Sequence, residues 1–239
     1  MFKILGIVDN YPYVKDLRKD WGFSAFLEKN GKKILFDTGS DGNILLNNAR
    51  VLHVDLSSID TLFISHYHYD HTGGVKELLE VNDHLKAYVP VPLLHEDEEL
   101  KNNFKRKGIQ VVECKEPLEI IDGIYSTGTM GVEIPEHSLY FISDEGSVLV
   151  TGCAHPGIES IISRVEELTG RKVHMAIGGF HLYGTHGSGL KERVDAIYAT
   201  GVERVGPSHC TGDNGREALK EKFGNRYVEF GSGINLAFS

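Results

Sequence analysis

Residues 66–71 read His-Tyr-His-Tyr-Asp-His, and this segment constrains the fold more than any other part of the chain. It follows the apolar run 61–64, which is typical of a buried strand, after the single residue Ser65, and a Thr-Gly-Gly sequence comes after it. Imidazole and carboxylate groups are side chains that bind zinc, iron or manganese. Four of them at the end of a strand predict a metal site at one edge of a sheet.

The composition fits an ordinary globular enzyme. The chain has 239 residues, of which 41% are hydrophobic and 25% are charged, and it shows no linker or repeat, so we expect one domain spanning 1–239. No apolar stretch approaches the ~20 residues that span a bilayer, and we expect a cytoplasmic protein without membrane contact. The formal charge of −9 disfavours nucleic acid as a partner and favours a small-molecule substrate. Three cysteines without a close pairing pattern argue against a disulfide framework.

Hydrophobic periodicity and turn residues predict a chain rich in both strands and helices. Strands are expected at residues 2–8, 23–28, 32–36, 61–64, 85–89, 109–112, 118–121, 124–126, 138–142, 148–151, 173–177 and 204–205. Helices are expected at residues 41–51, 74–81, 98–107, 158–168, 190–200 and 214–223. Because each half of the chain carries strands and helices, the pattern predicts two sheets face to face with helices outside, a four-layer αββα arrangement of the α/β class.

Three later histidines also follow predicted strands and are flanked by glycines. They are His155 in Gly-Cys-Ala-His-Pro-Gly, His181 in Gly-Gly-Phe-His, and His209 in Gly-Pro-Ser-His-Cys-Thr-Gly. Glycines allow the backbone to approach a ligand closely, so we expect these three to converge with the first cluster on one rim of the sheets. Five other histidines are expected to be ordinary solvated or packing residues: His53, His84, His95, His137 and His174.

The motif His66, His68, Asp70 and His71 resembles the metallo-β-lactamase superfamily, whose hallmark is His-x-His-x-Asp-His at a strand end. Several segments also resemble the branch named after dihydropterin-ribofuranosyl-aminobenzene phosphate synthase: residues 8–10, 36–39, 66–74, 152–158, 179–182 and 209–212. The resemblance covers nearly the whole chain. It implies an αββα sandwich with a dinuclear metal site at the shared edge of the two sheets.

The resemblance also implies a division of the ligands. His66 and His68 would help to hold one metal, Asp70 and His71 the other, with His209 as the late histidine of the second metal. Two divalent cations are therefore expected, with zinc as the first choice and iron or manganese as alternatives. Asp70 is expected both to bind metal and to shuttle a proton, and His181 to contact the substrate or its developing negative charge.

The chain departs from the superfamily pattern at one position. Many members carry a bridging aspartate where this chain has Cys153, two residues before His155. We favour His155 as the ligand that replaces the missing aspartate, with Cys153 as a buried packing residue. The alternatives are that the Cys153 thiolate is the ligand or that the second metal is held weakly. Asp37 is expected to orient a ligating imidazole through its other nitrogen, with Asn10 in a similar polar role.

Three functions follow from this pattern. The first is a metal-dependent hydrolase that uses a dinuclear-metal-activated water on a small ester or phosphate ester. The second is a synthase on the same scaffold, joining a dihydropterin to a ribofuranosyl-aminobenzene phosphate. The third is a non-catalytic metal or redox sensor, suggested by Cys153 and Cys210 beside the expected ligands. The Gly-rich segment 183–189 is expected either to cover the substrate or to be an ordinary flexible connection.

Overall fold

The structure, a computed structural model, describes residues 1–239 apart from the side chain of His95, so our expectation for that histidine lies outside the described side chains. The strands are β1 Phe2–Val8, β2 Ser24–Lys29, β3 Lys32–Phe36, β4 Thr61–Phe63, β5 Lys86–Val89, β6 Gln110–Glu113, β7 Leu118–Ile121, β8 Ile124–Ser126, β9 Leu139–Ile142, β10 Ser147–Thr151, β11 Val173–Gly179, β12 Arg204–Ser208 and β13 Asn235–Phe238. The α-helices are α1 Gly42–Val51, α2 Tyr69–Thr72, α3 Val75–Val81, α4 Leu93–Glu96, α5 Glu98–Lys107, α6 Ile158–Thr169, α7 Gly187–Ala199 and α8 Gly212–Phe223.

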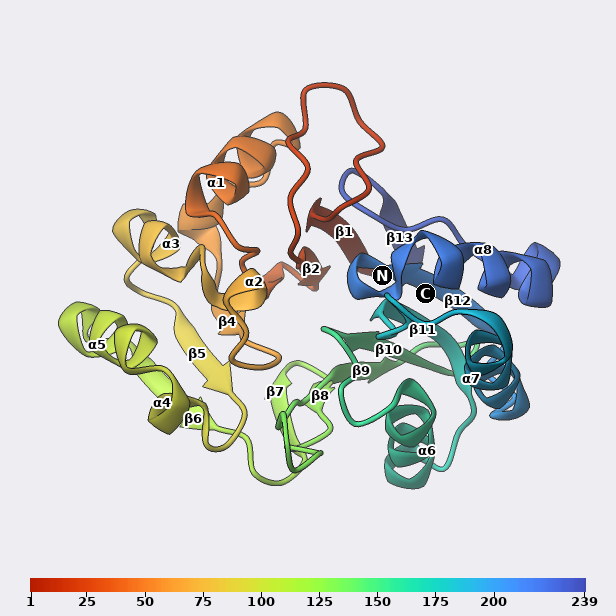
Figure 1. The fold of residues 1–239 in the computed structure, drawn as a ribbon. Helices are drawn as coiled ribbons and strands as arrows, with labels where there is room; N and C mark the ends of the chain where they lie inside the picture. Colours follow the sequence, from red (N-terminus) through yellow and green to blue (C-terminus); the bar gives the residue numbers. More distant parts are fainter.

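The strands form two mixed sheets: β1 to β6 with the last strand, β13, make the first, and β7 to β12 make the second. The first has the order β13-β1-β2-β3-β4-β5-β6, and the second has the order β12-β11-β10-β9-β8-β7. Strands β3 to β6 run parallel to one another, as do β10, β11 and β12. Figure 1 shows α1, α3 and α5 outside the first sheet and α6, α7 and α8 outside the second.

Three hydrophobic clusters explain why the layers stack in this way. One lies between the sheets and joins Phe36 of the first sheet to Val150 of the second. A second packs the outer face of the first sheet, including Leu62, under its helices, and the third does the same for the second sheet around Leu149. Because neighbouring residues 149 and 150 point to opposite faces of β10, both faces of that strand are buried. The predicted four-layer αββα sandwich is confirmed.

Local signals in the sequence also have physical counterparts. The hairpin between β2 and β3 turns at Asn30 and Gly31, whose φ values of 51° and 80° suit a two-residue turn of the primed type. The helix expected after residue 41 begins where the Asp41 carboxylate accepts the backbone N–H groups of Asn43 and Ile44.

Some elements differ from the prediction. Strand β13 was not expected; it adds to the edge of the first sheet by pairing antiparallel with β1. Strand β12 extends to Ser208, and α7 begins at Gly187 rather than residue 190, so the last three residues of the Gly-rich segment 183–189 form the first turn of a helix. Within the described part of the chain, no helix is both long and apolar enough to cross a membrane.

Candidate metal centre

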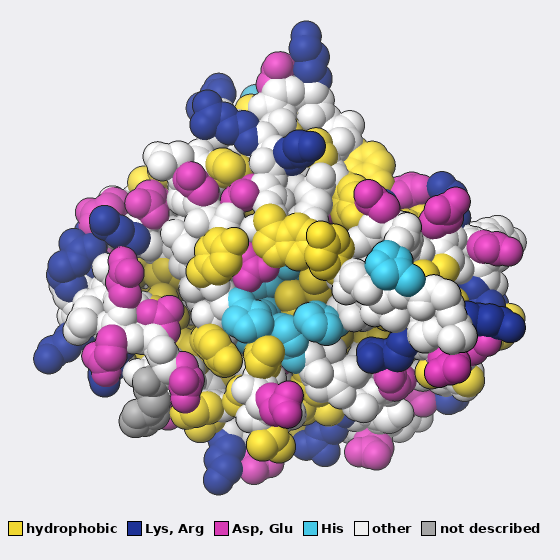
Figure 2. All heavy atoms as spheres, in the orientation of Figure 1, with side chains coloured by type: hydrophobic (Ala, Val, Ile, Leu, Met, Phe, Trp, Pro, Cys, Tyr) yellow, Lys and Arg dark blue, Asp and Glu magenta, His cyan; other side chains and the backbone are white. Residues whose placement is uncertain are grey.

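The predicted site residues lie at the carboxyl ends of strands from both sheets. His66 and His68 follow β4, and His155, His181 and His209 follow β10, β11 and β12. Because those last three strands are parallel neighbours, their carboxyl ends meet at one edge of the second sheet, opposite the end of β4. Figure 2 shows histidine side chains gathered in a hollow at the centre of this face, with hydrophobic side chains beside them.

The first ligand group consists of His66, His68 and His155. Each offers a ring nitrogen, and the three nitrogens lie within 4.8 Å of one another. His66 Nε2 is 3.2 Å from His68 Nδ1, and the His155 ring lies 4.8 Å and 4.9 Å from the rings of His66 and His68. This spacing allows three imidazoles to face one ion. His155 supplies the third nitrogen beside those of His66 and His68.

The second ligand group consists of Asp70, His71 and His209, again with donor atoms within 4.8 Å. Asp70 Oδ2 is 3.3 Å from His209 Nε2 and 3.8 Å from His71 Nε2. All three side chains are buried. The structure therefore brings together six residues named from the sequence, in two groups that adjoin because the rings of His66 and His71 are 4.1 Å apart.

Cys153 lies between the two groups. Its Sγ is 3.2 Å from His71 Nε2, and it forms a potential three-ligand set with His66 and His71, one residue from each group. Cys153 is buried, as a packing role requires, but its sulfur faces the donor atoms of both groups. The position of the expected bridging aspartate thus holds a side chain that a metal can also use.

Polar groups behind the ligands fix which ring nitrogen faces the site. Asp37 Oδ2 lies 2.6 Å from His71 Nδ1, Ser65 Oγ lies 2.9 Å from His66 Nδ1, and Asn10 Oδ1 lies 3.3 Å from His209 Nδ1. Each contact leaves the Nε2 atom for the centre, which is the usual arrangement around ligating imidazoles. The orienting contacts expected of Asp37 and Asn10 are therefore present.

The electrostatics of the metal-free centre differ between the two groups. Burial lowers the pKa of His155 to about 3, helped by neighbouring histidines, so that ring is neutral and ready to bind a cation. Burial also acts on His71, but the Asp37 carboxylate outweighs it and raises the pKa of His71 to about 9. Burial raises the pKa of Asp70, yet contact with His209 and the charge of His71 outweigh it and bring it to about 2. Asp70 is thus a carboxylate at neutral pH.

A buried carboxylate that the sequence did not single out holds the loop of the second sheet. Glu136 Oε1 accepts the hydroxyl of Thr151 and the backbone N–H groups of residues 152, 153 and 154, at 3.0–3.1 Å. Its Oε2 accepts the N–H of His155 at 2.8 Å. Five donors on one carboxylate fix the loop that carries Cys153 and His155. No local pattern at residue 136 signals this role, because its partners are distant in sequence.

The backbone is strained at the same loops. Eight non-glycine residues have positive φ, and four of them belong to site loops: Asp37, Ala154, His181 and His209, with φ of 54°, 58°, 50° and 46°. Such conformations cost energy and persist where the surroundings hold them, which is common at functional sites.

The donor set fits a bound cation. The Nε2 atom of His155 is buried and makes no hydrogen bond within the described residues. The Nε2 atom of His209 is buried 3.3 Å from Asp70 Oδ2. A buried nitrogen without a partner costs about 1–3 kcal/mol, and an ion at the centre would supply that partner. Imidazole, carboxylate and thiol donors together suit zinc, and also iron or manganese.

His181 lies at the rim of the centre. Its side chain is exposed, and its ring is 4.5 Å from that of His155. A hydrogen bond with Cys210 raises the pKa of His181. Cys210 is buried next to His209, and its sulfur contacts the carbonyl oxygen of Cys153 at 3.6 Å.

Three of the histidines that were expected to be ordinary solvated or packing residues belong to neither ligand group. His137 is buried with Nε2 2.8 Å from the Ile64 carbonyl and Nδ1 2.9 Å from Ser126 Oγ, so it supports the strand before the first cluster. His174 pairs with Glu203 at 3.0 Å, and the His84 side chain is 95% exposed.

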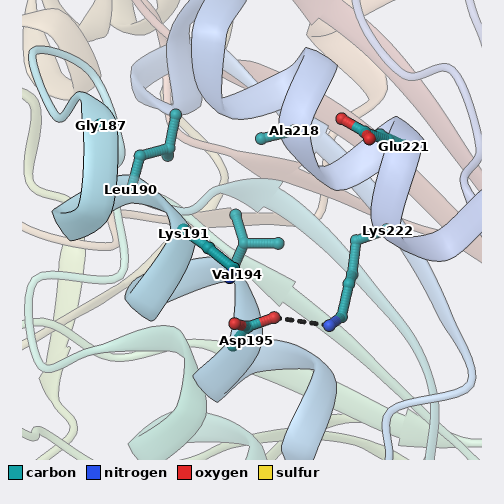
Figure 3. A pocket seen from close by; sticks show the side chains of 8 residues that line it. All are labelled: Gly187, Leu190, Lys191, Val194, Asp195, Ala218, Glu221 and Lys222. Carbon is teal, nitrogen blue, oxygen red and sulfur yellow. Dashed lines mark hydrogen bonds and ion pairs between the residues drawn. The ribbon is translucent and has the colours of Figure 1, made fainter.

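A separate cavity of about 440 Å³ lies between α7 and α8. Figure 3 shows its lining, in which Lys222 pairs with Asp195 across the two helices. None of the predicted site residues lines it. The chemistry expected from the sequence therefore belongs to the histidine centre.

Comparison with known proteins agrees with this geometry. The family model described as the metallo-beta-lactamase superfamily matches residues 22–190. The chain is 27% identical to the 7,8-dihydropterin-6-methyl-4-(beta-D-ribofuranosyl)-aminobenzene-5'-phosphate synthase of Methanocaldococcus jannaschii, over 99% of this chain and 96% of that protein. It is 31% identical to an uncharacterized protein of the same archaeon, over 89% of this chain and 91% of that protein.

Solved structures show the same fold. A metal-dependent hydrolase of the beta-lactamase superfamily superimposes with a TM-score of 0.78 at 25% identity, covering 100% of both chains. The short form of human tRNase Z superimposes with a TM-score of 0.66 at 12% identity, covering 99% of both chains, which bears on the fold alone. The chain belongs to the metallo-beta-lactamase superfamily.

Proposed function

We propose that the protein is a metal-dependent hydrolase of a small ester or phosphate ester. The observation that supports this most is the pair of adjoining ligand groups, His66–His68–His155 and Asp70–His71–His209, with Cys153 between them. The unpartnered buried Nε2 atom of His155 and the buried carboxylate of Asp70 among histidines favour cations at this place. We propose two divalent ions, with zinc first and iron or manganese as alternatives.

Each residue then has a defined task. Two divalent ions held there would acidify a shared water and polarise the bond to be broken. Asp37 and Asn10 hold the rings of His71 and His209 in the ligating orientation. Asp70 is a carboxylate with one oxygen toward the histidines, which leaves a lone pair to accept a proton. His181, exposed beside His155, is within reach of a substrate and can donate a hydrogen bond to its negative charge.

The second candidate is a synthase. It is favoured by the 27% identity over 99% of this chain to the archaeal dihydropterin–aminobenzene phosphate synthase. In that reaction the same residues would stabilise charge on a phosphorylated substrate, and water would not be the attacking group. The relative's name describes that protein, and the hydrolase remains our first proposal because the ligand groups suit the activation of water.

A substitution at His68 tests the hydrolase. We expect the zinc-loaded protein to hydrolyse members of a panel of phosphodiesters, phosphomonoesters and lactones, and His68→Ala to lose about 10²-fold or more in rate. His84→Ala is the matched control, because that histidine is 95% exposed outside the centre. Retention of full activity by His68→Ala would contradict the proposal.

The panel also separates the two candidates. Inertness on every ester, with product formed from a dihydropterin diphosphate and a ribosylated aminobenzene phosphate, would favour the synthase. Hydrolysis of at least one ester class, lost in His68→Ala, would favour the hydrolase.

A further inference from the structure

Three exposed aromatic side chains stand at the rim of the metal centre. Trp21 is 38% exposed, and Tyr69 and Tyr183 are each 68% exposed. Each is tied to the centre by a direct contact or by the chain itself: the Trp21 ring lies 5.3 Å from the His209 ring, Tyr69 precedes Asp70, and the Tyr183 N–H donates to the Cys210 carbonyl at 2.9 Å. Figure 2 shows hydrophobic side chains bordering the histidines on this face. The rim beside the histidines therefore carries exposed aromatic side chains.

Two of these rings brace each other. Trp21 and Tyr183 meet edge to face, with ring centroids 4.9 Å apart and planes at 66°. Gly212 packs against Tyr183 so closely that a Cβ there would lie 3.0 Å from the tyrosine ring. The pair is held in place before any ligand arrives, which lowers the entropy cost of binding against it.

Open space adjoins the tryptophan. A hollow of about 340 Å³ is lined by Asn10, Lys19, Asp20 and Trp21. Asn10, which lines this hollow, also contacts His209 Nδ1 of the second ligand group through its Oδ1 atom. A flat ring could lie against the indole there, with Lys19 and Asn10 offering donors to its polar substituents.

We propose that Trp21, braced by Tyr183, binds a planar aromatic or heteroaromatic ring of the substrate. This rests on the proposed function and narrows it: the substrate class becomes esters or phosphate esters that carry such a ring. If the rim acted only through the hydrophobic effect, it would bind a saturated ring as tightly as an aromatic one, because that effect follows the apolar area buried. If the Trp21 indole stacks on the substrate, the aromatic ring should bind more tightly than the saturated ring, since only the aromatic ring has a π face.

The test compares two phosphonates that differ only in the ring, benzylphosphonate and cyclohexylmethylphosphonate. Neither has an ester bond to break, so calorimetry on the zinc-loaded protein measures binding without turnover. We expect benzylphosphonate to bind about five- to tenfold more tightly, and to change the fluorescence of Trp21, the one tryptophan of the chain. Trp21→Leu should abolish the preference, and Trp21→Phe should keep most of it.

Tyr198→Leu is the matched control, because Tyr198 is 40% exposed and packs on Phe223, away from the histidines. It should leave the preference intact. Equal affinities in the unsubstituted protein, no binding of either phosphonate, or a preference that survives in Trp21→Leu would overturn the proposal. Failure of the hydrolase proposal shows instead as lack of turnover on esters, which leaves the binding preference unchanged.

Discussion

The carboxylate of Glu136 offers the sharpest test of how the centre is held together. It accepts five hydrogen bonds from the loop 151–155 and has no proton to donate in its ionised form. Glu136→Gln keeps the shape and removes one of the two acceptor atoms. If the amide oxygen takes the place of Oε1, its NH₂ group must face the N–H of His155.

The magnitude follows from these contacts. Leaving the His155 N–H without an acceptor costs about 1–3 kcal/mol. The other four bonds change from charge-assisted to neutral, which costs about 1 kcal/mol each. Glutamine carries no charge, so the cost of burying the Glu136 charge disappears and offsets part of this loss in stability. We therefore expect Glu136→Gln to lower the free energy of unfolding of the metal-free protein by about 2–4 kcal/mol.

A loop that is free to move also presents Cys153 and His155 less well. We expect the affinity for the first metal to fall by about 10–100-fold, as for other residues that support ligands. Urea unfolding measures the stability, and competition with a chromogenic chelator measures the affinity. Glu119→Gln is the control, because that exposed glutamate accepts one backbone N–H, from Gly123, and should cost little. A Glu136→Gln protein as stable as the Glu119→Gln protein, with unchanged metal affinity, would refute the reasoning.

Two further predictions concern the ion pair behind the site and the packing of a glycine. The pKa of His71 is about 9 in the folded, metal-free protein against 6.5 for an unperturbed histidine, so its stabilisation, up to about 3 kcal/mol, is complete below pH 6.5 and is lost as the pH rises through 9. An NMR titration of the His71 ring checks this, and a midpoint below 6.5 would contradict it. Gly178→Ala should prevent stable folding, because a Cβ there would lie 2.0 Å from the Thr151 carbonyl oxygen at a φ of +119°. Gly184→Ala has open space around it and should cost only about 1 kcal/mol for its positive φ; thermal unfolding compares the two, and equal melting temperatures would count against the packing argument.

The fold was readable because its signals are local. Buried strands such as β4 and β10 are apolar runs, and the Asn30-Gly31 turn fixes a hairpin within two residues. Strand β13 escaped prediction because its four residues form a strand only by pairing with β1 at the other end of the chain. The start of α7 at Gly187 escaped for a different reason: glycine has a low helix propensity, so local preference placed the start later than the structure does.

The residues of the candidate site could be predicted from the sequence, but much of their geometry could not. Strand-end histidines beside glycines pointed to one rim, and the structure brings them there. The direction of Cys153 depends on a loop held by Glu136, 17 residues earlier, and no sequence spacing encodes that contact. The aromatic rim was equally hidden, because Trp21 and Tyr183 come together only in three dimensions.

The count of bound metal ions tests the central claim most directly. Elemental analysis of protein equilibrated with zinc and freed of excess should find close to two ions per chain. Because His155 and His209 belong to different ligand groups, His155→Ala and His209→Ala should each retain about one ion, and the double variant none. A protein that holds no zinc, or a double variant that still holds two ions, would contradict the account.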